Sequence, residues 1–99
     1  MNEYAYEFNK KISKIINDNI SKITFGVQDV ANHFEISKST LNRKVKSILG
    51  QTTQQLIMEA KLQKARELQL KNPYMSQKEI ASAVGINNSD YLFKKLNLK

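Results

Sequence analysis

Residues 27–52 read VQDVANHFEISKSTLNRKVKSILGQT and contain two helical patterns separated by a short turn. The first pattern predicts a helix over about Val27–Phe34, in which Ala31 is small enough for a second helix to cross closely. Ser37 then provides an N-cap for a helix over about Lys38–Leu49, and Gly50 follows as its C′ residue. The apolar positions of this second helix lie on one side only, so its other side is offered outward.

Residues 79–96, EIASAVGINNSDYLFKKL, repeat this pattern about fifty positions later. The equivalent positions are Val30-Ala31 and Ile80-Ala81, Phe34 and Val84, Leu41 and Leu92, Arg43 and Lys94, and Val45 and Leu96. A helix, a tight turn and a second helix with one buried side are the pattern of a helix-turn-helix motif. Two such units in register indicate a chain built from a pair of these motifs.

The remaining patterns complete an all-α prediction of six helices and no sheet. Capping boxes begin two of the helices, with Thr52 paired to Gln55 and Ser76 paired to Glu79, and Asn88 or Ser89 caps the last helix. The other helices are predicted over about Tyr6–Asn19, Thr53–Leu70, 76–83 and Ser89–Leu96. We expect one domain over residues 1–99, consisting of a first helix-turn-helix unit (8–50), a long linker helix (53–70) and a truncated second unit (76–99).

Composition narrows the possible functions. The chain has 16 Lys+Arg and 9 Asp+Glu, a net charge of +7, which favours a polyanionic partner. It has no cysteine and one histidine, His33, which excludes disulfides, thiol catalysis and most metal sites. No apolar run approaches the length of a membrane span, and the start lacks the apolar stretch of a signal peptide, so we expect none. We therefore expect a soluble cytoplasmic protein that is not an enzyme and has no cofactor or metal.

The positive charge is concentrated in residues 36–50, which carry four basic side chains and no acidic one. Residues 1–35 instead carry four lysines and five acidic residues. The long helix of about 18 residues spans ~27 Å, enough to hold two outward helices near one turn of DNA, ~34 Å, apart. The helices over Lys38–Leu49 and Ser89–Leu96 would then enter successive major-groove segments on one face of the duplex.

These residues resemble the DNA-binding domain of AraC/XylS-type transcription regulators over about residues 8–96. The first unit has the alanine, turn, serine, leucine and arginine of that family, followed by G-x-[ST]. IMEAKLQKARELQL (57–70) is similar to the family's linker helix, and the second unit has its I-A, V-G and aromatic positions. The resemblance implies sequence-specific binding of double-stranded DNA by a bacterial, nucleoid-associated regulator. KKISKIINDNIS (10–21) is also similar to versions fused to the C-terminus of hybrid two-component sensors.

The sequence departs from the family pattern at several positions. Glu35 stands where glycine is common, so we expect a strained turn if the backbone there is left-handed. Lys61 replaces a common arginine and Thr53 a usual proline, while Ile86 and Leu92 stand where phenylalanine is frequent. The family pattern continues with a glycine-containing turn, a proline and a short seventh helix, whereas this sequence stops at residue 99. We expect a fragment of a larger regulator, with any dimerisation through a domain absent from this chain.

The resemblance to the AraC/XylS family implies which side chains contact DNA, and these form two sets. Base contacts are expected from Ser39, Asn42, Arg43, Ser89, Asp90 and Phe93. Arg43 is the main candidate because a guanidinium binds guanine O6 and N7 bidentately, and Asn42 can bind adenine by the same geometry. Phe93 is expected to face outward, either against a thymine methyl or against the missing seventh helix, whereas Tyr91 is expected to face inward. Phosphate contacts are expected from Lys38, Thr40, Lys44, Lys46, Asn88, Lys94 and Lys95.

The sequence is compatible with two hypotheses for the function of the basic helices. In the first hypothesis, the first helix-turn-helix unit supplies sequence specificity and the second unit mainly supplies affinity for double-stranded DNA. In the alternative, the chain is a helical protein-interaction module that binds an acidic partner. RNA polymerase is a further candidate partner, for example of such a protein-interaction module. A membrane surface is disfavoured because the basic helices lack large aromatic faces.

Overall fold

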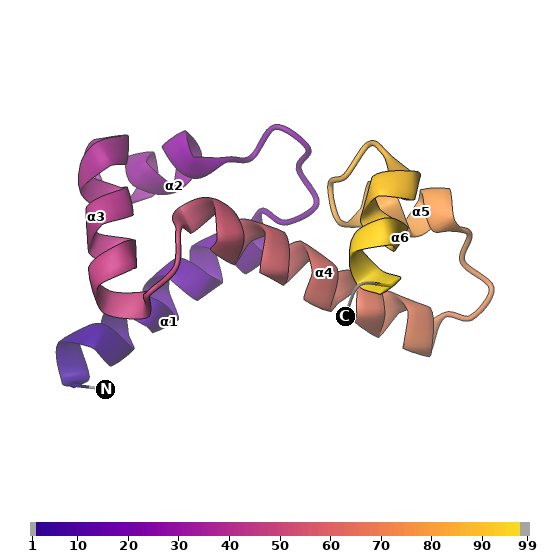
Figure 1. Cartoon of the computed structure of the whole chain (residues 1–99), viewed down its shortest axis with the longest axis horizontal. Helices are drawn as coiled ribbons and strands as arrows, with labels where there is room; N and C mark the ends of the chain where they lie inside the picture. Colours follow the sequence, from indigo (N-terminus) through magenta and orange to yellow (C-terminus); the bar gives the residue numbers. More distant parts are fainter. Residues whose placement is uncertain (1, 98–99) are drawn as a thin grey trace.

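The computed structural model describes residues 2–97, which form six helices and contain no strand (Figure 1). In chain order the helices are α1 (Glu3–Asp18), α2 (Val27–His33), α3 (Lys38–Leu49), α4 (Thr53–Lys71), α5 (Gln77–Ala83) and α6 (Ser89–Asn97). The all-α prediction is confirmed, and α3 has the predicted bounds. The helix α1 begins earlier than predicted because the Asn2 side chain accepts a hydrogen bond from the Ala5 N–H at 2.7 Å.

The predicted helix caps are present. The Ser37 hydroxyl accepts a hydrogen bond from the Thr40 N–H, and Gly50 ends α3 in the left-handed region with φ 72°. Both capping boxes form, at the starts of α4 and α5. In the second box, hydrogen bonds from Ser76 hold the pKa of Glu79 below its ordinary value. The N-terminus of α6 is capped by Asn88, whose side-chain oxygen accepts from the Tyr91 N–H at 3.0 Å.

Two hydrophobic clusters lie at opposite halves of a molecule that measures 41 × 26 × 22 Å. The first is formed by Phe8, Ile12, Ile16, Phe25, Val30, Ala31, Leu41, Val45 and Ile57. The second is formed by Leu62, Ala65, Ile80, Ala81, Val84, Ile86, Leu92, Phe93 and Leu96. The helix α4 contributes to both, because it packs against α1 and α3 near its start and against α5 and α6 further along. Its apolar positions therefore have packing partners on two sides, as predicted.

Burial follows the internal repeat. Ala31 and Ala81 are 0% and 2% exposed, and both leucines of the repeat, Leu41 and Leu92, are fully buried. The turns also correspond, since Glu35 has φ 57° and the equivalent Gly85 has φ 69°. The strained turn expected at Glu35 is confirmed, because a residue with a Cβ is disfavoured in the left-handed region. None of the helices formed by residues 2–97 is long and apolar enough to cross a lipid bilayer.

Candidate nucleic-acid interface

The outward face of α3 is basic and unobstructed. Leu41 and Val45 are fully buried on its inner side, and the helical period places Ser39, Arg43 and Lys46 on the opposite side, where all three are exposed. Among the described residues no carboxylate lies within ion-pairing distance of the Arg43 guanidinium. The five N–H donors of this side chain are therefore not occupied by an acidic neighbour.

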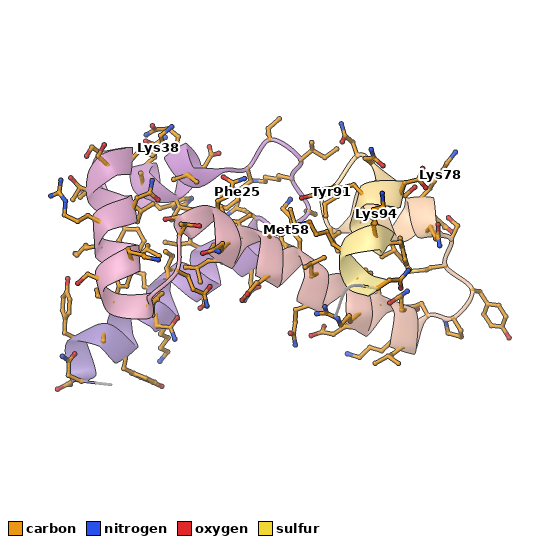
Figure 2. The ribbon with its side chains drawn as sticks, in the orientation of Figure 1. Phe25, Lys38, Met58, Lys78, Tyr91 and Lys94 are labelled. Carbon is orange, nitrogen blue, oxygen red and sulfur yellow. The ribbon has the colours of Figure 1, made fainter. Side chains whose placement is uncertain are left out.

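The helices α3 and α6 lie toward opposite ends of the long axis and run roughly parallel (Figure 1). The first turns of both helices lie at the upper edge of that view. Lys38, on the first turn of α3, and Lys78, on α5, lie along the same edge (Figure 2). One edge of the molecule therefore carries two helix N-termini, which have partial positive charge, together with lysine side chains.

Asn42 is held by a contact that the sequence did not indicate. Its side-chain Oδ1 accepts a hydrogen bond of 2.8 Å from the hydroxyl of Thr53, which is fully buried at the start of α4. The threonine that replaces the family's usual proline thus has a partner on α3. The Asn42 amide N–H₂ stays at an exposed position, so the contact orients this side chain while leaving its donors available.

Asn42→Ala is expected to lower the free energy of unfolding by about 1–3 kcal/mol, because the buried Thr53 hydroxyl loses its acceptor. The double variant Asn42→Ala/Thr53→Val is expected to regain most of this loss, since removing both partners of a buried hydrogen bond is nearly neutral. Urea denaturation of the wild type, both single variants and the double variant measures the coupling. Equal unfolding free energies for the wild type and Asn42→Ala would show that the contact has no energetic role.

In α6 the prediction for two aromatic side chains was wrong. Phe93 is 9% exposed and packs in the second cluster, whereas Tyr91 is 42% exposed. The reason is that this position of the second helix faces α4 in both units: Asn42 accepts a hydrogen bond from Thr53 of α4, and the equivalent Phe93 belongs to the same hydrophobic cluster as Leu62 of α4. The outward side of α6 is instead formed by Asp90, Tyr91, Lys94 and Lys95, all of which are exposed.

The other predicted contact residues lie in different surroundings. Lys94 is exposed on the front of α6 (Figure 2), and the Lys95 ammonium lies 5.6 Å from the centre of the Tyr91 ring. Asn88 is exposed beside the helix that it caps, while Thr40 and Ser89 are half-buried. The Lys44 ammonium lies 5.4 Å from the centre of the Tyr4 ring and 5.5 Å from that of Phe8, so it is directed toward α1.

Three features of the surface and interior were missed in the sequence. Tyr91 was placed inward, Lys78 was not singled out, and Lys61 was noted only as a departure from arginine. Lys61 is 4% exposed, and burial lowers its pKa below the ordinary value for lysine. The break in the apolar pattern of α4 at this position was the only signal, and it did not indicate burial. Within residues 2–97, histidine and carboxylate side chains form no group of three that could hold a metal ion.

The described geometry agrees with comparisons to known proteins. A family model described as "Helix-turn-helix domain" matches residues 30–97, which is more than half of the chain. The chain belongs to the AraC-type helix-turn-helix family. This AraC-type chain is 39% identical over 72 residues to the "Uncharacterized HTH-type transcriptional regulator YfiF" of Bacillus subtilis (strain 168). The matched region is 73% of this chain but only 22% of the length of that relative.

Solved structures share the AraC-type fold. The C-terminal domain of the two-component response regulator yesN from Fusobacterium nucleatum superposes with a TM-score of 0.82 at 22% identity, covering 93% of this chain and 94% of that one. The C-terminal domain of AraT, a response regulator from Geobacillus stearothermophilus, has a TM-score of 0.79 at 28% identity, with coverage of 88% and 74%. A DNA-binding transcriptional dual regulator from Escherichia coli K-12 has a TM-score of 0.78 at 23% identity, with coverage of 88% and 76%.

The resemblance inferred from the two motifs is thus confirmed. The family match and the regulator relative support DNA-binding transcription regulation as the role of this kind of domain.

Proposed function

We propose that this chain binds double-stranded DNA sequence-specifically, with α3 and α6 in successive major-groove segments. The observation that carries the proposal is the exposed basic face of α3, together with a roughly parallel α6 whose first turn lies at the same edge (Figure 1). Recognition helices of helix-turn-helix proteins contact base edges with their N-terminal residues. The 41 Å length of the molecule accommodates two such helices about one turn of DNA, ~34 Å, apart.

The side chains divide into two roles under this proposal. Base edges are read by Ser39, Asn42 and Arg43 of α3 and by Ser89 and Asp90 of α6, with Arg43 on a guanine. Phosphates are contacted by Lys38, Thr40, Lys46, Asn88, Lys94 and Lys95. Two residues that the sequence did not suggest, Lys78 and Tyr91, join the phosphate contacts because they are exposed beside this set. Phe93 and Lys44 are left out, since one is buried and the other is directed toward α1.

The similar structures support a biological setting for this proposal. Two of the similar structures are C-terminal domains of response regulators. We therefore propose that this chain is the DNA-binding output part of a two-component protein, acting on the nucleoid in the cytoplasm.

The proposed function is tested by selecting bound duplexes from a random-sequence pool at moderate salt. We expect two enriched short sequence elements, called boxes below, about one helical turn of DNA apart, because both recognition helices read bases. Affinity for the selected duplex should fall by roughly two to three orders of magnitude between 50 and 200 mM salt, given about five lysine–phosphate contacts. A single box would contradict base reading by α6. Complete absence of DNA retention would favour the protein-interaction alternative.

A further inference from the structure

The two halves of the molecule meet at a tight junction. The connection between α1 and α2 (residues 19–26) approaches the turn between α5 and α6 (residues 84–88), as Figure 1 shows. A Cβ atom built on Gly85 would lie 2.7 Å from the backbone oxygen of Ile20 and 3.0 Å from the backbone carbon of Lys22. Two backbone segments are therefore in direct contact. One belongs to the half of the molecule built on the first hydrophobic cluster and the other to the half built on the second.

Lys61 lies on α4 beneath this junction. Along the helix it stands between Ile57, which belongs to the first cluster, and Leu62, which belongs to the second. Its Nζ donates hydrogen bonds to the backbone oxygen of Gly85 at 2.9 Å and to that of Ile20 at 3.4 Å. One buried ammonium therefore joins three segments that are far apart in the sequence.

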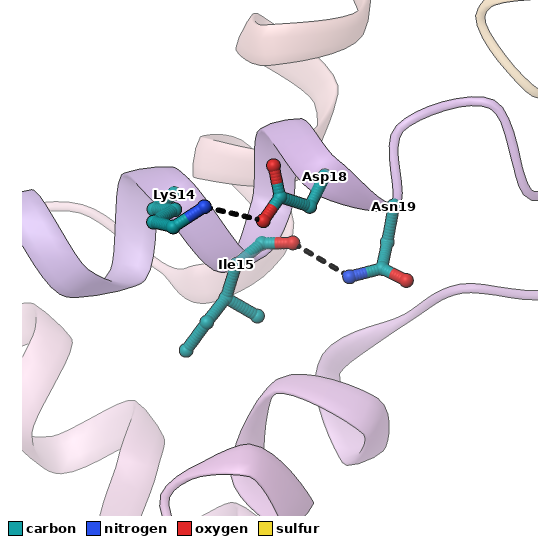
Figure 3. A network of polar contacts seen from close by, with 4 residues as sticks. All are labelled: Lys14, Ile15, Asp18 and Asn19. Carbon is teal, nitrogen blue, oxygen red and sulfur yellow. Dashed lines mark hydrogen bonds and ion pairs between the residues drawn. The ribbon is translucent and has the colours of Figure 1, made fainter.

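The loop on the first side of the junction is itself anchored. The Asn19 side chain donates to the Ile15 backbone oxygen at 2.8 Å, and Lys14 pairs with Asp18 at 2.9 Å in the same turn of α1 (Figure 3). The Lys22 ammonium donates to the Asn19 Oδ1 at 2.9 Å. These contacts order the last turn of α1 and the residues that follow it, from which the Ile20 carbonyl reaches Lys61.

A buried ammonium is a poor choice for stability alone. Removing it from water is unfavourable, and no carboxylate among the described residues lies within ion-pairing distance to compensate it. An apolar side chain of similar length would avoid that penalty. What an apolar side chain cannot supply is a directional bond to two backbone carbonyls, which selects one arrangement of the two halves over others.

We propose that Lys61 is a positioning residue that sets the separation and relative rotation of α3 and α6, and thereby the spacing of DNA boxes that the protein accepts. This inference rests on the proposed function. Each base pair added between two boxes moves the second by ~3.4 Å and rotates it by about a tenth of a turn. A rigid junction therefore requires one spacing, and a loosened junction tolerates several.

The DNA experiment uses the selected two-box duplex, versions with one or two base pairs inserted or removed between the boxes, and a single-box duplex. The wild type should lose roughly tenfold or more in affinity when the spacing changes. Lys61→Met should retain single-box affinity and lose most of the spacing preference, and Lys61→Arg should restore it. Lys64→Met is the matched control, since it removes a lysine from α4 at an exposed position and should keep the wild-type preference.

A second measurement needs no DNA. The chain lacks cysteine, so spin labels can be attached uniquely at Ser47→Cys on α3 and Gln77→Cys on α5, two exposed positions outside the proposed contacts. The label–label distance distribution should be narrow in the wild type and in Lys64→Met. In Lys61→Met it should broaden or shift.

The outcomes separate the two proposals. A wild type that selects no paired boxes overturns the proposed function and the DNA role of Lys61 with it. A bipartite wild type whose spacing preference and label distances are unchanged in Lys61→Met overturns the positioning role alone. Equal losses on single-box and two-box DNA would also overturn it, because they indicate a general loss of folded protein. If Lys61→Met does not fold, Lys61→Gln takes its place in both measurements, because its side chain is uncharged and too short to reach both carbonyls.

Discussion

Arg43→Ala is expected to lower the affinity for the selected duplex by roughly 10- to 100-fold, while affinity for random duplex falls far less. A bidentate arginine–guanine pair contributes about 1–3 kcal/mol of discrimination against the wrong base. Arg43 is exposed on the outer face of α3 and has no acidic partner among residues 2–97, so it can make this contact without breaking another. Leu41 and Val45, which hold α3 in place, are on the opposite side and stay unchanged.

Two further variants determine whether Arg43 reads a base. Arg43→Lys keeps the charge but lacks the planar fork, so it should retain random-DNA affinity and still lose most of the specific affinity. Lys94→Ala removes a proposed phosphate contact and should weaken both duplexes to a similar extent, with a salt-dependence slope smaller by about 1. Equal losses of Arg43→Ala on selected and random duplex would assign Arg43 to the phosphates as well. Binding is measured by fluorescence anisotropy at fixed salt.

Much of the fold could be predicted because its signals are local. Ser37, Gly50 and the two capping boxes act within one helical turn, so short patterns were sufficient to place the ends of α3, α4 and α5. The small residues Ala31 and Ala81 identified the helix crossings, and the repeat indicated that both units share one arrangement. Strain was expected at Glu35 because the family commonly has glycine there, and the equivalent position of the second unit is indeed Gly85, with a similar φ.

The site was less predictable where side chains depend on segments remote in sequence. Carrying the outward positions of α3 over to the equivalent positions of α6 placed Phe93 outward. This position instead faces α4, where the first unit has a polar pair and the second has a hydrophobic cluster. Lys61 was missed because its partners are residues 20 and 85, and the break that it makes in the apolar pattern of α4 does not reveal them. A lysine on a long helix is usually solvated. Only the folded structure, in which the segments around residues 20 and 85 contact Lys61, shows that this one is buried.

Gly85→Ala is expected to destabilise the protein by about 3 kcal/mol or more. Part of this is the cost of placing a Cβ in the left-handed region, about 1–2 kcal/mol, because Gly85 has φ 69°. The larger part is steric, since the new methyl would lie 2.7 Å from the Ile20 carbonyl oxygen and 2.8 Å from the Lys61 Nζ. The Lys61 ammonium is the end of a flexible side chain and can shift, but the Ile20 oxygen and the Lys22 carbonyl carbon are backbone atoms, so the junction must open.

Gly50→Ala provides the control that separates these two contributions. Gly50 has φ 72°, nearly the same backbone conformation as Gly85, but nothing lies within 4 Å of the position that its Cβ would occupy. It should therefore lose only the backbone part, about 1–2 kcal/mol. The difference between the two variants, measured by urea denaturation, is the steric cost of fitting a methyl group into the contact between the two halves. If both variants lose the same amount, the junction is loose in solution, and a fixed separation between α3 and α6 would have to come from α4 alone.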